Sequence, residues 1–201
     1  MNKDIQTYLH NSLNAINLIP LDKVADLAEA ILYTYNEGST IYTMGNGGSG
    51  ATASHVAGDY VKGASFGLEK RFRFICLNDN IPALMAISND ISYEAIFEEQ
   101  LKNFARPGDL VIGLSGSGNS KNVVNALQWA KNQGIKTAAL TGYKGGQCAQ
   151  IADISIHIPV ADMEIVEDLH MMTFHAIKRY ITNTLLGENP GMGAVYDQRI
   201  K

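Results

Sequence analysis

The sequence predicts an α/β protein with a mainly parallel sheet, flanked by helices on both faces, and with extra N-terminal helices and a long C-terminal helix. Two observations lead to this fold class. Short hydrophobic runs rich in β-branched residues alternate with longer segments of helical periodicity. In addition, two glycine-rich stretches follow predicted strands, at the sheet edge where folds of this class bind ligands. The 201 residues are long enough to form one domain with a sizeable core.

The N-terminal segment is predicted to be helical. Hydrophobic residues recur at spacings of three or four between Ile5 and Ile16, which predicts a helix that ends before Pro20. A second helix is expected to begin near residue 21. Residues 1–36 therefore form the N-terminal helices of a single domain.

Strands and helices alternate through the remainder of the chain. The hydrophobic runs predict strands at residues 40–44, 72–77, 110–114, 137–141 and 154–158. The periodic segments predict helices from about residue 49 and over 82–88, 93–104, 121–133 and 163–186. A polar tail is expected from 187 to 201. This order favours βαβ units and thus a parallel sheet.

The charge and cysteine content limit the function classes. The formal net charge is −4, so no overall positive field is present to bind a nucleic-acid backbone. Cys76 and Cys148 form no paired motif, which favours a reducing compartment. No apolar run approaches the roughly 20 residues of a membrane helix. We therefore expect a cytoplasmic protein that binds neither nucleic acid nor membrane.

The third predicted strand ends in the serine-rich loop LSGSGNS. Ser115, Ser117, Asn119 and Ser120 lie between this strand and the next helix. Free backbone N–H groups at a helix start, together with hydroxyl donors, can bind a phosphate or a carboxylate. The GxxxxGK[ST] pattern is absent, which favours a monophosphate over a triphosphate. The alternative is an ordinary strand-to-helix turn with a serine cap.

Two further glycine-rich segments follow strands. GNGGSG matches the pattern GxGxxG, but Glu69 precedes the next strand and Asp79 comes late, so the acid of a dinucleotide site is not where it is expected. Asn46 is instead a candidate to bond a sugar hydroxyl, and Ser49 is a candidate either to cap the next helix or to bond a phosphate. The segment TGYKGGQ is expected to be a plain turn.

Two helices carry side chains that can perform acid–base chemistry or bind a metal. His55 and Asp59 are four residues apart and share a helix face, a spacing that suits a metal site or a base held by its partner. A surface ion pair has the same spacing. On the last helix Glu167, His170 and His175 are candidates, and position alone does not separate a solvated face, a core histidine and a functional group.

Several motifs in a fixed order resemble the sugar isomerase (SIS) domain family, and within it the phosphoheptose isomerases. They are GNGGSG with SHVAGD, ISNDISYEAIFEEQL, RPGDLVIGLSGSGNSKNVVNAL, TGYKGG and EDLHMMTFH. The match extends to about Leu186. The resemblance implies a three-layer, Rossmann-like fold and an aldose–ketose isomerase, often with zinc, that forms a homotetramer. It implies conversion of sedoheptulose 7-phosphate to D-glycero-D-manno-heptose 7-phosphate through an enediol.

The resemblance also implies residue roles. Asp59 and His175 would perform the acid–base steps. Substrate contacts would come from Asn46, Gly47, Ser49, Asp90, Ser115, Gly116, Ser117, Asn119, Ser120 and Glu167. A Zn²⁺ or similar divalent ion would be held by His55, Asp59, Glu167 and His175, a mixture of imidazole and carboxylate ligands that suits it.

The sequence departs from the family pattern at three chemically important positions. Asp59 replaces a glutamate, Glu167 replaces a glutamine, and Gly63 stands where an arginine is frequent, with Lys62 as a candidate substitute for its charge. These changes leave two alternatives open: a non-catalytic SIS module that binds a sugar phosphate or a protein partner, and an isomerase of another phosphosugar.

Overall fold

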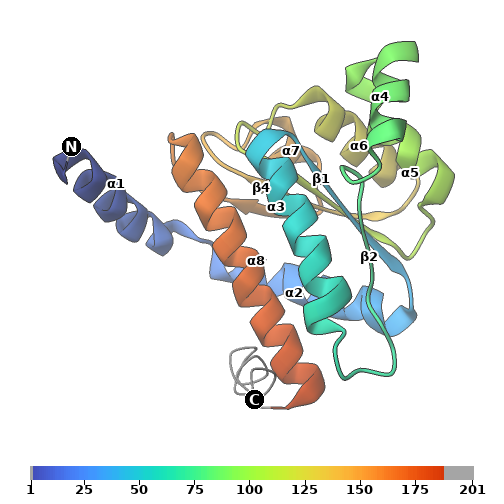
Figure 1. The fold of residues 1–201 in the computed structure, drawn as a ribbon, viewed down its shortest axis with the longest axis horizontal. Helices are drawn as coiled ribbons and strands as arrows, with labels where there is room; N and C mark the ends of the chain where they lie inside the picture. Colours follow the sequence, from blue (N-terminus) through green and yellow to red (C-terminus); the bar gives the residue numbers. More distant parts are fainter. Residues whose placement is uncertain (1, 188–201) are drawn as a thin grey trace.

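A computed structural model describes residues 2–187, which form a five-stranded sheet between two layers of helices (Figure 1). All neighbouring strands are parallel, and their order is β2-β1-β3-β4-β5. The strands are β1 (Thr40–Gly45), β2 (Arg73–Cys76), β3 (Leu110–Ser115), β4 (Lys136–Thr141) and β5 (Ile154–His157). The predicted fold class and all five predicted strands are confirmed.

The helices follow the predicted order with two differences. They are α1 (Asn2–Ala15), α2 (Leu21–Glu37), α3 (Gly47–Gly58), α4 (Ile81–Asp90), α5 (Glu98–Phe104), α6 (Lys121–Asn132), α7 (Gly146–Ile151) and α8 (Met163–Leu186). The single helix predicted over 93–104 is wrong, because a 3₁₀ turn at Tyr93–Ala95 precedes α5. The short helix α7 begins within the predicted plain turn. The predicted tail, apart from Gly187, lies outside the described residues.

The two faces of the sheet are covered by different helices. In β3, Leu110 and Ile112 belong to the core with α2, α3 and α8, whereas Val111 belongs to the core with α5, α6 and α7. This division follows from the strand geometry, in which successive side chains point to opposite faces. No helix within residues 2–187 is long and apolar enough to cross a membrane.

Helices α3 and α8 pack against each other and so align their side chains along one seam (Figure 1). A π-helical segment, Asp59–Ala64, continues α3. Tyr60 in this segment is fully buried, with its ring stacked on Phe74 at a centroid distance of 4.7 Å and edge-on to Phe72 at 5.2 Å. This anchor fixes the backbone direction at the preceding residue, Asp59, which is only partly buried.

The buried His170 on α8 is expected to make stability depend on pH. Burial lowers its pKa from 6.5 to about 4, offset only in part by a backbone contact with Thr141. The folded state therefore favours neutral imidazole, and this contribution is complete above pH 6.5 and is lost as the pH falls to 4. The loss is about 3 kcal/mol. Urea unfolding of wild type and His170→Leu across this range tests it, since the variant should lose less stability; identical pH profiles would contradict the prediction.

Candidate active site

The serine-rich loop forms a tight turn between β3 and α6. The Ser115 hydroxyl donates a hydrogen bond to the Ser120 hydroxyl oxygen over 3.1 Å. Ser120 is the N-cap residue of α6 but does not cap it with its side chain. Gly118 lies at φ +68°, a conformation that glycine adopts without a steric penalty. The hydroxyl groups are thus gathered at a helix start, where anions bind favourably.

The segment predicted to be a plain turn after β4 holds this loop in place. The Gly142 N–H donates to the Gly116 carbonyl and the Cys148 N–H to the Gly118 carbonyl, each over 2.9 Å. The Asn119 side chain also stabilises the loop, because its amide nitrogen donates a hydrogen bond to the Ser117 carbonyl over 3.0 Å. Asn119 therefore shapes the loop, although it does not line the cavity described below.

Asn46 connects the glycine-rich loop after β1 to helix α6, which follows the serine-rich loop. The amides of Asn46 and Asn122 donate to each other's oxygen, both over 2.9 Å. The Tyr93 hydroxyl also donates to the Asn46 oxygen over 2.9 Å. Sequence reasoning missed Asn122 and Tyr93, because neither lies in a glycine-rich motif. These contacts fix the distance between the two loops.

A cavity of about 250 Å³ lies between the two loops and the start of α8. Eight of the predicted substrate residues line it, namely Asn46, Gly47, Ser49, Ser115, Gly116, Ser117, Ser120 and Glu167. Sequence reasoning missed Gly48, Leu114 and Met163, which complete the lining. The cavity is therefore rich in small residues and hydroxyl groups, as a site for a phosphate ester requires.

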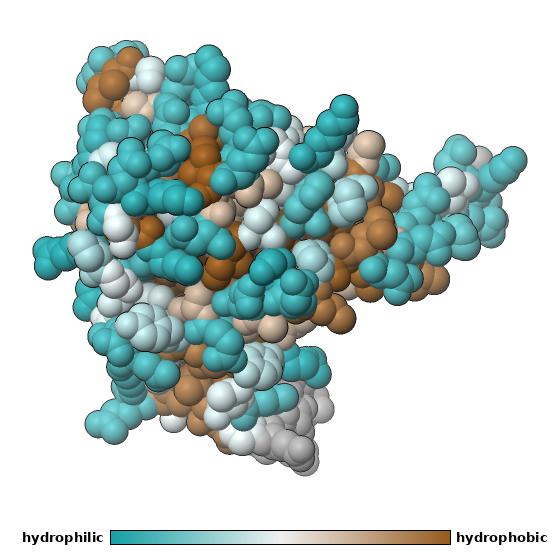
Figure 2. Space-filling view, turned by 180° about the vertical axis from the view of Figure 1, so that it is seen from behind, coloured by the Kyte–Doolittle hydropathy of each residue, from teal (hydrophilic) through white to brown (hydrophobic). Residues whose placement is uncertain are grey.

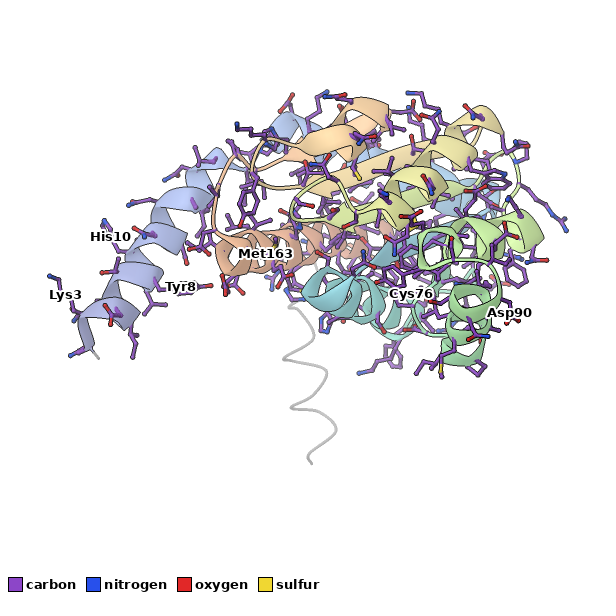
Figure 3. The ribbon with its side chains drawn as sticks, turned by 90° about the horizontal axis from the view of Figure 1, so that it is seen from above. Lys3, Tyr8, His10, Cys76, Asp90 and Met163 are labelled. Carbon is purple, nitrogen blue, oxygen red and sulfur yellow. The ribbon has the colours of Figure 1, made fainter. Side chains whose placement is uncertain are left out.

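The structure does not bring Asp90 to this cavity. Asp90 is exposed at the end of α4 and accepts a hydrogen bond from the Asn89 side chain over 2.7 Å. Figure 3 shows Asp90 well separated from Met163, which lines the cavity. The prediction that Asp90 contacts the substrate therefore has no support from the geometry of this chain.

Glu167 brings a carboxylate into the cavity. Its carboxyl group lies so close to Gly48 that a Cβ atom at Gly48 would overlap it. A negative charge in this position can accept hydrogen bonds from sugar hydroxyls, but it repels a phosphate in the serine loop.

Glu167→Gln is therefore expected to bind inorganic phosphate about fivefold more tightly, which corresponds to about 1 kcal/mol for one charge pair in a largely aqueous setting. Calorimetric titration with inorganic phosphate measures the change. Glu164→Gln, an exposed position on the same helix, is the matched control and should leave the affinity unchanged. A Glu167→Gln affinity equal to that of the control would contradict the prediction.

A second group of polar side chains lies farther along the seam between α3 and α8. The Nε2 atoms of His55 and His175 are 3.2 Å apart, and Oδ2 of Asp59 is 3.7 Å from each of them. His55 and Asp59 share a face as their spacing predicted, and His175 reaches them from α8. Although His55 and His175 are 120 positions apart in the sequence, the fold brings them and Asp59 to one point.

The donor atoms of this group suit a small divalent ion. Tetrahedral zinc bonded at 2.0–2.1 Å to nitrogen and oxygen would hold its ligand atoms about 3.4 Å apart, which is close to the three observed separations. Three protein ligands with one open position are typical of catalytic zinc. Glu167, the fourth predicted ligand, precedes His175 by about two helical turns and belongs to the cavity instead.

One cation of the group was missed by sequence reasoning. The ammonium nitrogen of Lys178 lies 2.9 Å from Oδ2 of Asp59, and its side chain is largely buried. Lys178 follows His175 by three residues on α8, so helical periodicity alone places both on one face. That signal was available in the sequence.

The fold and the two sites define the class of protein. The chain matches the SIS domain family over residues 7–142, more than half of its length, and it belongs to that family. Within the family it is similar to proteins named phosphoheptose isomerase.

Three of these relatives illustrate the similarity. A probable phosphoheptose isomerase of Thermoplasma volcanium is 37% identical over 87% of this chain and 88% of its own length. The phosphoheptose isomerase of Aliarcobacter butzleri is 38% identical over 83% of this chain and 86% of its own. The structure of phosphoheptose isomerase from Neisseria gonorrhoeae superposes with a TM-score of 0.83 at 27% identity, covering 90% of this chain and 97% of that one.

Proposed function

We propose that this protein is an aldose–ketose isomerase that converts sedoheptulose 7-phosphate to D-glycero-D-manno-heptose 7-phosphate through an enediol. The observation that carries the proposal is the common seam of the two sites. The serine-lined cavity and the group of His55, Asp59 and His175 lie along the same faces of α3 and α8. Relatives named phosphoheptose isomerase, similar over most of their length, support the same reaction.

The arrangement fits the substrate because the two sites are separated. Gly48 and Glu167 mark the cavity, and His55 and His175 lie about two helical turns farther along α3 and α8 respectively. In a heptose 7-phosphate the reacting carbons C1 and C2 are at the opposite end from the phosphate. Binding the phosphate in the serine loop would hold C1 and C2 near the imidazole and carboxylate groups, and this positioning lowers the entropic part of the barrier.

The reaction moves one proton from C1 to C2 and a second from the C1 hydroxyl to the C2 oxygen, and it requires stabilisation of the enediolate oxygen. We assign the proton transfer to Asp59 and His175, whose Oδ2 and Nε2 atoms lie 3.7 Å apart. His55, Asp59 and His175 would hold a Zn²⁺ or similar ion, and such an ion supplies charge stabilisation for a developing oxyanion. Both imidazoles lie beside the carboxylate, with each Nε2 atom 3.7 Å from Oδ2 of Asp59.

A proton NMR time course in D₂O tests the proposal. Incubation of sedoheptulose 7-phosphate with the protein, with and without EDTA, is expected to give new aldose signals with deuterium at C2. Sensitivity to EDTA would support the metal group. Saturable binding without exchange would replace the isomerase with a non-catalytic binding module. Turnover of another ketose phosphate, but not this one, would change the substrate.

We also propose a homotetramer, with the N-terminal helix as part of the contact between copies. Helix α1 projects from the body, and apolar surface is visible where this arm meets the body (Figures 1 and 2). Ile5, Leu9 and Leu13, at helical spacing, are each more than half exposed. Exposed apolar surface of this kind marks interaction sites. Light scattering of the intact chain, compared with Leu9→Glu, would measure the assembly.

A cytoplasmic location is a further proposal, supported by the two cysteines. Cys76 and Cys148 are buried and unpaired in the cores on opposite faces of the sheet. Burial raises the pKa of the thiols to about 11 and about 12, so both are held as neutral thiols. Such cysteines persist readily in a reducing compartment.

A further inference from the structure

The ammonium group of Lys178 occupies space that Gly63 leaves open. A Cβ atom at Gly63 would lie 2.9 Å from the Lys178 nitrogen and 3.0 Å from its Cε atom. Gly63 is buried in the π-helical segment, four residues after Asp59. Because Gly63 has no side chain, the Lys178 side chain of α8 has room to lie there. The two positions lie 115 residues apart, so only the fold brings them together.

Lys178 and the two histidines all lie nearest to the same oxygen of the Asp59 carboxylate. Oδ2 of Asp59 is 2.9 Å from the Lys178 nitrogen and 3.7 Å from both Nε2 atoms. A divalent ion held by His55 and His175 would use this oxygen, because it is the one that faces them. Such an ion would also stand close to a positive charge that is only 17% exposed and therefore poorly screened by solvent.

We propose that Lys178 is a positioning residue of this site, which fixes the Asp59 carboxylate and competes with a divalent cation for its Oδ2 atom. The proposal deepens the proposed function, because it concerns the same metal group. When no ion is bound, the ammonium balances the carboxylate charge and keeps it aligned with the histidines. When an ion binds, the lysine must share or release Oδ2, so the chain holds the ion more weakly than its three ligands alone would.

Zinc calorimetry on the full-length protein tests the proposal without using any substrate. Lys178→Met keeps the length and packing of the side chain but removes the charge, and its affinity for Zn²⁺ is expected to rise at least tenfold. Gly63→Ala should displace the ammonium and give part of the same gain. Lys178→Arg keeps the charge and should restore the wild-type affinity. Cobalt absorption spectra report in parallel on the number and type of ligands.

Two control variants locate the effect. Arg179→Met removes a positive charge from the exposed neighbouring position on α8 and should leave the zinc affinity unchanged. His55→Ala should abolish the binding, which would assign it to this group. Equal affinities for Lys178→Met and Arg179→Met, or a weaker affinity of Lys178→Met than wild type, would overturn the proposal. Failure to isomerise sedoheptulose 7-phosphate would overturn the proposed function but would leave the zinc result as it stands.

Discussion

Replacing His175 by alanine is expected to lower kcat/KM for sedoheptulose 7-phosphate by about 10³-fold, within the range that general acid–base groups contribute. The Nε2 atom of His175 lies 3.2 Å from Nε2 of His55 and 3.7 Å from Oδ2 of Asp59, so its loss removes one proton carrier from the group. Because the serine-lined cavity is about two turns away, KM should change little and kcat should carry the loss.

The measurement is a steady-state assay of wild type, His175→Ala and a control variant at equal protein concentration. His10→Ala is the matched control, because this histidine is exposed on α1 (Figure 3) and belongs neither to the cavity lining nor to the group of His55, Asp59 and His175. Its activity should equal that of the wild type. A His175→Ala enzyme with more than a tenth of the wild-type kcat would remove His175 from the catalytic group.

Gly118→Ala is expected to reduce the free energy of unfolding by about 4 kcal/mol and to abolish phosphate binding. Gly118 has φ +68°, and a Cβ atom there would overlap the carbonyl oxygen of Gly145. A left-handed conformation strains alanine by about 1 kcal/mol, and overlap with a backbone atom adds about 3 kcal/mol because the backbone must move. The movement would separate the serine loop from the segment that supports it.

Gly134→Ala is the control for this prediction, since Gly134 has φ +73° and no atom within 4 Å of an added Cβ. It should therefore cost only the strain of about 1 kcal/mol. Urea unfolding measures both variants, and titration with inorganic phosphate reports on the cavity. Equal losses of stability would show that conformational strain, not contact with Gly145, determines the role of Gly118.

The secondary structure was largely predictable because it depends on local patterns. All five strands and helix α8 lie where the hydrophobic runs and the helical periodicity placed them. The helix predicted over 93–104 failed for a tertiary reason. The Tyr93 hydroxyl donates a hydrogen bond to the Asn46 side chain, and Tyr93 begins a 3₁₀ turn that ends before α5. Periodicity contains no information about such a partner.

The candidate site was only partly predictable. The serine and glycine loops were found because small residues at the ends of strands have a direct physical meaning. The division of the four predicted metal ligands was missed: the spacing of Glu167 and His175 already separates them by about two helical turns, but only the position of α3 decides which group each one joins. The TGYKGGQ segment was underestimated for a similar reason, since Gly142 within it and Cys148 directly after it support Gly116 and Gly118 through backbone hydrogen bonds that do not depend on the side chains.

The sequence by itself determined the parallel α/β architecture, the two small-residue loops and the pairing of His55 with Asp59 on one helix face. These follow from spacing within single elements, where period and chirality fix the geometry. Only the tertiary structure decided that α8 lies beside α3, that Lys178 occupies the space that Gly63 leaves open, and that Asp90 lies apart from the cavity. Such choices depend on how whole elements pack, and packing joins residues that are far apart in the chain.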